Sequence, residues 1–240
     1  MKKISSKVFC NVLSNAVIVC LILMVFFVGF AYNGLSAVFV DNDVKAIYNG
    51  DKSKNNISLM VNVYWGNEYL SDMLKTLEKY NVKATFFVGG CWVAKNEDTF
   101  LTIVESGQEI GSHGYFHKDH KKLDYNANYN EIAVTHKLVK ELSGVEMNLF
   151  APPSGSFNST TLKVANDLNY KTIMWSKDTI DWRDKDEGLV YSRATKNLQN
   201  GDLILMHPTE HTAAALGKII EYVLKSGFRI VTVGENIGIT

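Results

Sequence analysis

Two histidines four residues apart, His113 and His117, are the residues whose type and spacing most clearly suggest chemistry. Placed on one side of a helical turn, such a pair can bring both imidazoles to a single metal ion. Imidazole ligands suit zinc and the other late first-row metals. On its own, a pair of this kind is more often two solvated or hydrogen-bonded loop histidines, so both interpretations stay open at this point.

A third histidine, His207, follows the apolar run 203–206 and would stand at the rim where a strand ends. Alone, it is typical of a structural histidine. Asp178 and Asp181 are candidates to accept a hydrogen bond from its second ring nitrogen and so to hold one tautomer. Without His207 nearby, both carboxylates are typical of solvated groups in a polar loop. Pro152-Pro153 indicates a rigid turn after another strand.

These residues depend for their positions on elements that alternate along the chain from residue 57 onward. Short apolar runs predict strands, and helical spacing such as that of Leu70, Met73, Leu74 and Leu77 separates them. Near-continuous apolar strands that alternate with amphipathic helices indicate an α/β protein with a parallel sheet covered by helices. About six or seven such units favour a compact β/α barrel, in which chemistry lies in the loops after the strands. The strands are expected at 57–63, 84–88, 109–111, 172–175, 203–206 and 229–233.

Composition limits the class of protein. Of 240 residues, 46% are hydrophobic and 21% are charged, which is ordinary for a globular domain with a buried core. The 25 basic and 25 acidic residues cancel, which argues against nucleic acid or an anionic membrane surface as a partner. Cys91 is the one cysteine after the first 40 residues, so no disulfide can form within that part of the chain.

The first 40 residues differ from the rest of the chain. Lysines precede an apolar run from Ala16 to Tyr32, which is about the lower limit for crossing a ~30 Å hydrocarbon core. The positive flank predicts a cytoplasmic N-terminus and an extracytoplasmic domain on a single-pass cell-membrane protein. A cleaved signal peptide is the alternative, and the length of the run favours an uncleaved anchor. The expected organisation is therefore 1–40 cytoplasmic N-terminus and membrane anchor, 41–56 polar tether and 57–240 functional domain.

Five stretches in residues 57–236 together resemble the polysaccharide deacetylase family, also known as the NodB-homology or carbohydrate esterase 4 domain. They are NVKATFFVGG, GQEIGSHGYFHKDH, FAPPSGSFN, WSKDTIDW and GDLILMHP, and their order and spacing are highly specific. The resemblance implies a distorted (β/α) barrel and a divalent metal, zinc for preference, bound by an Asp-His-His set. It implies removal of N-acetyl, and sometimes O-acetyl, groups from a cell-wall polysaccharide such as peptidoglycan or a chitin-like polymer.

The resemblance also implies a mechanism. A metal-bound water, activated by an aspartate base, attacks the acetamide carbonyl, and a histidine then protonates the leaving amine. Carried over by position, His113 and His117 would be metal ligands and His207 the general acid. Asp178 or Asp181 would orient that acid. The substrate would be lined by Pro153, Trp182 and Leu205, the last two at the acetyl pocket.

The first family motif departs from its pattern here. Where the family has Thr-Phe-Asp-Asp-Gly, this chain has the run 62–66, Asn-Val-Tyr-Trp-Gly. The base aspartate is therefore Tyr64 and the metal-binding aspartate is Trp65. The arginine that tethers the base in the family is Ala151. An indole cannot ligate a metal, and a phenol with a pKa near ~10 is a poor base at neutral pH.

Three functions remain compatible with these departures. The first is a hydrolase with a rearranged site, in which Glu68 or Tyr64 would accept and transfer the proton. The retained His207 favours this function. A second is a catalytically silent glycan-binding domain, in which Tyr64, Trp65 and Trp182 stack on sugar. A third is an assembly scaffold on the outer membrane face. In the hydrolase, the metal shell would be completed by Asn67, Glu68, Asp119 or His120.

Overall fold

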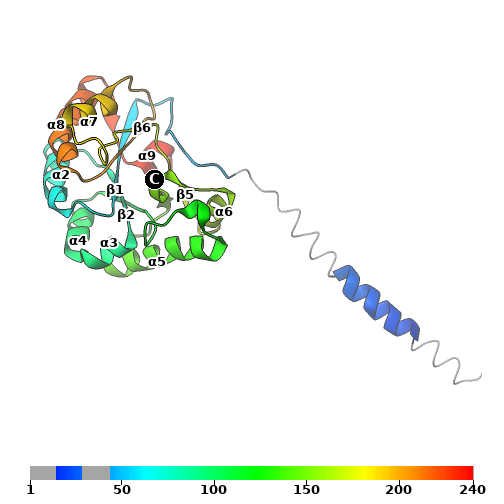
Figure 1. The fold of residues 1–240 in the computed structure, drawn as a ribbon. Helices are drawn as coiled ribbons and strands as arrows, with labels where there is room; N and C mark the ends of the chain where they lie inside the picture. The colour runs from blue at the N-terminus through cyan, green and yellow to red at the C-terminus, as the bar shows by residue number, and fades with distance from the viewer. Residues whose placement is uncertain (1–14, 29–43, 240) are drawn as a thin grey trace, which may run out of the picture. The chain divides into compact units, whose positions relative to one another are not determined.

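The computed structural model describes residues 15–28 and 44–239, and the chain divides into two units between Asp43 and Val44 (Figure 1). Residues 15–28 are helical. Among the described residues, no helix is long and apolar enough to cross a membrane. The end of the expected anchor, residues 29–32, and the lysines before it lie outside the described ranges.

The second unit contains a sheet whose strand pairings are all parallel. The order is β5-β4-β3-β2-β1-β7-β6, and β8 also pairs with β1. Helices surround the curled strands in Figure 1, which confirms the predicted distorted (β/α) barrel. The strands are β1 (Asn56–Val63), β2 (Thr85–Val88), β3 (Glu109–Ser112), β4 (Leu149–Phe150), β5 (Lys171–Thr172), β6 (Lys177–Asp178), β7 (Leu203–Met206) and β8 (Arg229–Ile230).

Helices join the strands as the alternating pattern predicts. In α2, the buried residues are the four apolar positions that the spacing singled out: Leu70, Met73, Leu74 and Leu77. They form one stripe because they recur at the helical period. The helices are α2 (Asn67–Lys79), α3 (Gly90–Lys95), α4 (Glu97–Glu105), α5 (Tyr125–Ser143), α6 (Ser159–Asp167), α7 (Glu187–Thr195), α8 (Glu210–Lys225) and α9 (Val233–Ile237), with 3-10 turns at His120–Lys122 and Pro153–Gly155.

Two apolar cores lie on opposite faces of the sheet. Ile57, Leu59 and Val61 of β1 pack in a large cluster with residues of the surrounding helices. Met60, between them, belongs to a smaller cluster together with residues such as Phe87 and residues of β4 and β7. Because neighbouring side chains of a strand point to opposite faces, the smaller cluster fills the barrel interior.

Two strands are shorter than the apolar runs suggested. The run 172–175 forms only the end of β5, and 229–233 forms β8 and then the start of α9. Thr232 caps α9 by accepting a hydrogen bond from the backbone of Glu235, which ends the extended conformation. Part of the expected tether also pairs with the domain: Ile47 forms a parallel bridge with Ile173.

Candidate functional site

The side chains that the sequence analysis singled out converge at one end of the barrel. Trp65 follows β1, the run 113–117 follows β3, the run 179–182 follows β6 and His207 follows β7. The strands are parallel, so their carboxyl ends meet at the same edge of the sheet. The fold therefore brings together residues separated by more than 140 positions in the chain.

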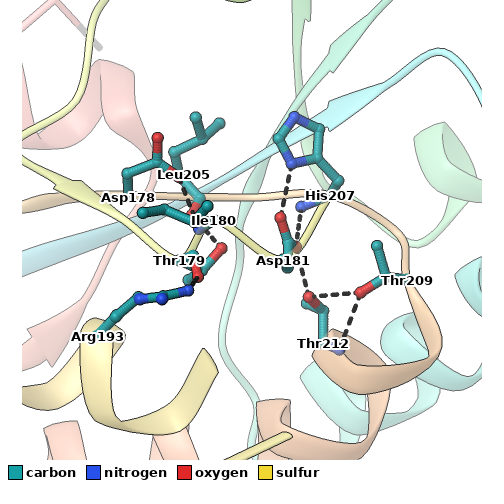
Figure 2. A network of polar contacts seen from close by, with 9 residues as sticks. All are labelled: Asp178, Thr179, Ile180, Asp181, Arg193, Leu205, His207, Thr209 and Thr212. Carbon is teal, nitrogen blue, oxygen red and sulfur yellow. Dashed lines mark hydrogen bonds and ion pairs between the residues drawn. The ribbon is translucent and has the colours of Figure 1, made fainter. Parts of the chain in front are cut away.

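His207 is held by a buried carboxylate (Figure 2). The Asp181 carboxylate accepts hydrogen bonds from the backbone N–H of His207, at 2.7 Å, and from Nδ1 of its ring, at 2.8 Å. The hydroxyl of Thr212, on α8, donates to the same carboxylate at 2.5 Å. Since the carboxylate can only accept, ring Nδ1 carries a proton, and Nε2 is the ring nitrogen that Asp181 does not engage.

Burial alone would raise the pKa of Asp181. The hydrogen bonds from His207 and Thr212 outweigh that effect, and the pKa is lowered from its ordinary value. The carboxylate is therefore ionised in the folded protein at neutral pH. Sequence analysis left Asp178 and Asp181 as alternatives for orienting His207, and in the structure Asp181 makes the contact.

Asp178 has a different position. Its carboxylate accepts from the backbone of Ile180 at 2.8 Å and shapes the turn that carries Asp181. Thr179 fixes that turn to β7, because its hydroxyl donates to the carbonyl of Leu205 at 2.9 Å (Figure 2). Arg193, on α7, donates to the carbonyl of Thr179 at 3.0 Å. Hydrogen bonds thus fix the loop between β6 and α7 to β7 on one side and to α7 on the other.

The predicted helical turn at His113 and His117 is wrong. The segment is an irregular loop, because Gly114 has a φ of 72° and His117 a φ of 54°, both in the left-handed region. The two imidazoles are nevertheless in edge contact, with ring centroids 5.0 Å apart. Loop geometry, rather than helical spacing, brings the two rings together.

His113 is almost fully buried, with 2% of its surface exposed. Its Nδ1 donates to the carbonyl of Ala151 at 2.7 Å, which leaves the lone pair on Nε2. Burial, with a smaller contribution from His117, lowers the pKa of His113 to about 3. Burial also lowers the pKa of His117. Both rings are therefore neutral at physiological pH.

Aromatic rings stand where the family has its two aspartates. Tyr64 lies 5.0 Å from the His117 ring, centroid to centroid, and burial raises the pKa of its phenol. Trp65 lies almost parallel to the His207 ring, at 8° and 5.8 Å between centroids, and 44% of its surface is exposed. These substitutions replace an anionic site by a neutral, aromatic one.

Two imidazoles alone do not make the three-ligand set of a catalytic zinc site. Asn67 is engaged elsewhere, because its Oδ1 accepts from the indole of Trp92 at 2.5 Å. Glu68 lies exposed in the first turn of α2, and Asp119 pairs with Lys122 at 3.0 Å. Within residues 15–28 and 44–239, no three His, Cys, Asp or Glu side chains gather in a way that could hold a metal ion.

The remaining candidate for the metal shell, His120, is fully buried behind the loop. Its Nδ1 lies 2.7 Å from Oδ1 of Asn128, and burial lowers its pKa. The donor set of the described residues therefore does not fit the divalent metal that the resemblance implies.

The predicted substrate-lining residues differ in their exposure. Pro153 is buried in a 3-10 turn, and Leu205 belongs to the apolar cluster inside the barrel. Trp182 is 55% exposed and has the Arg183 guanidinium 6.0 Å from its ring. Leu205 can thus contribute an apolar floor, whereas Trp182 presents its ring to solvent.

Sequence analysis missed Phe116 and Glu131. Phe116, in the histidine loop, is 55% exposed. Glu131, on α5, is 4% exposed and accepts hydrogen bonds from the loop backbone. A signal for Glu131 exists, since it shares a helical stripe with Ile132, Thr135 and Val139, all of them buried. Apolar spacing alone passes over a polar member of such a stripe.

Comparison with known proteins places this architecture in a family. The model of the polysaccharide deacetylase family matches residues 49–173, just over half of the chain. The Bacillus subtilis protein YlxY is 39% identical over 189 residues, which are 79% of this chain and 59% of YlxY. The peptidoglycan-N-acetylglucosamine deacetylase PgdA of Listeria monocytogenes is 34% identical over 167 residues, 69% of this chain and 35% of PgdA. The chain thus spans less than two thirds of either relative.

Solved structures agree with the sequence relatives. BA3943 of Bacillus anthracis, described as a pseudoenzyme of carbohydrate esterase family 4 (CE4), matches with a TM-score of 0.80 and 36% identity. The match covers 82% of this chain and 70% of that one. From the matching family model, the relatives and the shared barrel, we conclude that this chain belongs to the polysaccharide deacetylase (CE4) family, as a divergent member without the two aspartates of the first motif.

Proposed function

We propose that the domain binds an acetylated amino-sugar polymer of the cell wall and does not hydrolyse it. The observation that carries this proposal is the position of Trp65. At the place of the family's metal-binding aspartate, an indole lies parallel to the ring of His207 and leaves 44% of its surface exposed. An indole cannot hold a metal ion, but its flat face can pack on the apolar face of a sugar ring.

Two further exposed aromatic side chains support binding. Phe116 and Trp182 are each 55% exposed, and they lie in the loops after β3 and β6. Together with Trp65 they are the exposed tryptophans and phenylalanine of residues 44–239. All three stand at the same end of the barrel. Exposed aromatic rings in loops at one end of a barrel are typical of a binding surface.

The polar groups between these rings suit a neutral, acetylated ligand. The neutral imidazole of His113 carries a proton on Nδ1, which is engaged, and a lone pair on Nε2, and Nδ1 of His207 is likewise engaged by Asp181. Such a lone pair can accept a hydrogen bond from an acetamido N–H or a sugar hydroxyl. No anionic side chain replaces the two lost aspartates, whose positions hold Tyr64 and Trp65.

Relatives give independent support. PgdA is a peptidoglycan-N-acetylglucosamine deacetylase, and BA3943 is described as a pseudoenzyme. A BA3943 mutant with restored enzymatic activity has the same TM-score, 0.80, to this chain. A CE4 barrel can therefore lose its catalytic activity and keep its fold.

Hydrolysis is the second candidate, and one observation favours it. The hydrogen-bonded set of Asp181, His207 and Thr212 is complete, as an acid that protonates a leaving amine requires. Its partners in hydrolysis are missing. The raised pKa of Tyr64 leaves a neutral phenol where the family has its base, and the described residues offer no three-donor metal site.

We also propose that the apolar run 16–32 holds the domain at the outer face of the cell membrane. The length of the run and the lysines before it support this placement. Membrane fractionation and protease protection of intact cells would test it. Recovery of the full-length chain in the soluble cytoplasmic fraction would contradict it.

The test of binding is a comparison of variants in the full-length protein. We expect insoluble peptidoglycan or chitin to retain the wild type, and Trp65→Ala to weaken retention about tenfold or more because it removes the stacking face. Tyr222→Ala is the matched control, since Tyr222 is 41% exposed but lies near the end of α8, a helix that begins beside the carboxyl end of β7 and leads away from it. Absence of retention by the wild type, or equal retention by Trp65→Ala, would refute the proposal.

A further inference from the structure

The loop that follows β3 has a backbone that other parts of the molecule must hold in place. Gly114 and His117 both have left-handed φ values, 72° and 54°. For the non-glycine residue this conformation costs roughly 1 kcal/mol or more, so it persists only where surrounding contacts determine it. The residues between them include the exposed Phe116.

One carboxylate makes those contacts. Oε2 of Glu131 accepts hydrogen bonds from the backbone N–H groups of Tyr115 and Phe116, both at 2.8 Å. Its other oxygen lies 3.4 Å from Nζ of Lys118. Backbone donors that meet an ionised oxygen form stronger hydrogen bonds than neutral pairs do. A single side chain of α5 therefore contacts the loop at three residues, Tyr115, Phe116 and Lys118.

Burial makes this arrangement unusual for a glutamate. Glu131 is 4% exposed, whereas the side chain of Glu141, on the same helix, is 64% exposed. A buried carboxylate is costly unless it is paired and hydrogen-bonded, and here the loop supplies the partners. The fit is close at Gly114 as well, where an added Cβ would lie 3.2 Å from Oε2 of Glu131.

From these contacts we infer that Glu131 is a positioning residue of the glycan-binding site. It sets the conformation of loop 113–117 and so presents Phe116 and the His117 ring at the end of the barrel. The role in glycan binding rests on the proposed function. Its role in holding the loop does not depend on that function, and the two roles are measured by separate experiments.

Amide hydrogen exchange of the full-length protein measures how firmly the loop backbone is held, and it needs no glycan. In the wild type, the Tyr115 and Phe116 amides should exchange slowly although the Phe116 side chain is exposed, because both N–H groups are bonded to Glu131. Glu131→Ala should speed their exchange about tenfold or more. Glu131→Gln should stay within a few-fold of the wild type, because an amide oxygen can accept the same two bonds. Glu141→Ala is the control and should change nothing.

Glycan retention and the thermal midpoint are measured on the same variants. We expect Glu131→Ala to lose about tenfold in retention and Glu131→Gln to keep most of it. Fast exchange of both amides in the wild type would overturn the inference even if the alanine variant failed to fold. So would a glutamine variant that exchanges as fast as alanine. If neither the wild type nor any variant binds glycan but the amides exchange as expected, the proposed function is refuted. The role of Glu131 in holding the loop is then still supported.

Discussion

Asp181 and His207 are joined by two hydrogen bonds, one to the backbone N–H and one to ring Nδ1 of the histidine, at 2.7 and 2.8 Å. The pair links the loop after β6 to the end of β7, and Thr212 of α8 completes it. This framework is independent of any metal, which explains how the site geometry can outlast the loss of the first-motif aspartates.

We predict that Asp181→Ala lowers the free energy of unfolding by about 3 kcal/mol, because three buried donors lose their acceptor. Asp178→Ala is the matched control, three residues earlier at the end of β6. It should cost about 1 kcal/mol or less, since Asp178 is only partly buried and accepts a single backbone bond there. Urea denaturation measures both. Equal losses would mean that the His207 pair has no special part in stability.

Stability should fall as the pH drops, and His113 provides the reason. Below pH 6.5, its ordinary pKa, the imidazole is protonated in the unfolded chain, whereas in the folded protein it stays neutral until about pH 3. The free energy of unfolding therefore decreases across that window, by up to about 1.4 kcal/mol per pH unit from this residue. Asp181, whose pKa is lowered, adds a loss only below its ordinary value of 3.8.

Denaturation midpoints measured from about pH 7 down to about pH 4.5 isolate the histidine window. The His113→Asn variant should show a shallower decline than the wild type over this range. An unchanged slope would show that burial does not suppress protonation of this ring.

The barrel architecture could be predicted from local apolar patterns in the sequence. Which polar residues are buried could not, because it depends on hydrogen-bond partners outside each element. The stripe of α2 and the strands β1 and β7 could be read from apolar spacing, because each buries its own face against the sheet or the helices. The inward face of α5 does not follow from apolar residues alone. Leu138 and Leu142 are only half-buried, and the polar Asn128 and Glu131 are fully covered. These polar side chains can be buried because the loop before α5, residues 115–124, supplies their hydrogen-bond partners.

The candidate site shows the same division. Motif resemblance located His113, His117 and His207, but it could not choose between Asp178 and Asp181. That choice depends on the turn at Ile180, whose φ of 52° reverses the chain between the two carboxylates. Left-handed backbone at non-glycine residues carries no clear sequence signal, so the loop was expected to be helical.

The donor set predicts that the wild-type protein takes up no stoichiometric zinc at micromolar metal, because the described residues offer two imidazoles and no third ligand. Trp65→Asp restores the ligand type that the family has at this position and should create zinc binding. Adding His113→Gln to that variant should abolish it. Inductively coupled plasma mass spectrometry after dialysis measures the metal. Tight zinc binding by the wild type would contradict this prediction.

Comparing Gly114 with Gly144 tests how closely loop 113–117 packs against its neighbours. Both have a left-handed φ, 72° and 73°, so alanine is strained at either position. At Gly114 an added Cβ would also lie 3.1 Å from Nε2 of His120 and 3.2 Å from Oε2 of Glu131, whereas at Gly144 nothing lies within 4 Å.

We therefore expect Gly144→Ala to cost about 1 kcal/mol and Gly114→Ala to cost about 1 kcal/mol more, because the second must also displace buried polar groups. Thermal unfolding of the two variants gives the comparison. Equal midpoints would show that the loop can move away from Glu131 at little cost.

The most direct test of the account is mass spectrometry of a glycan that the protein has bound. Purified full-length protein is incubated with N-acetylated peptidoglycan fragments and zinc, and the bound and free fragments are analysed for their acetyl content, with an active CE4 enzyme as the positive control. We predict retention of the fragments with every acetyl group intact. Time-dependent loss of acetyl groups that disappears in His207→Ala would show that the site still catalyses hydrolysis, and it would contradict the proposed function.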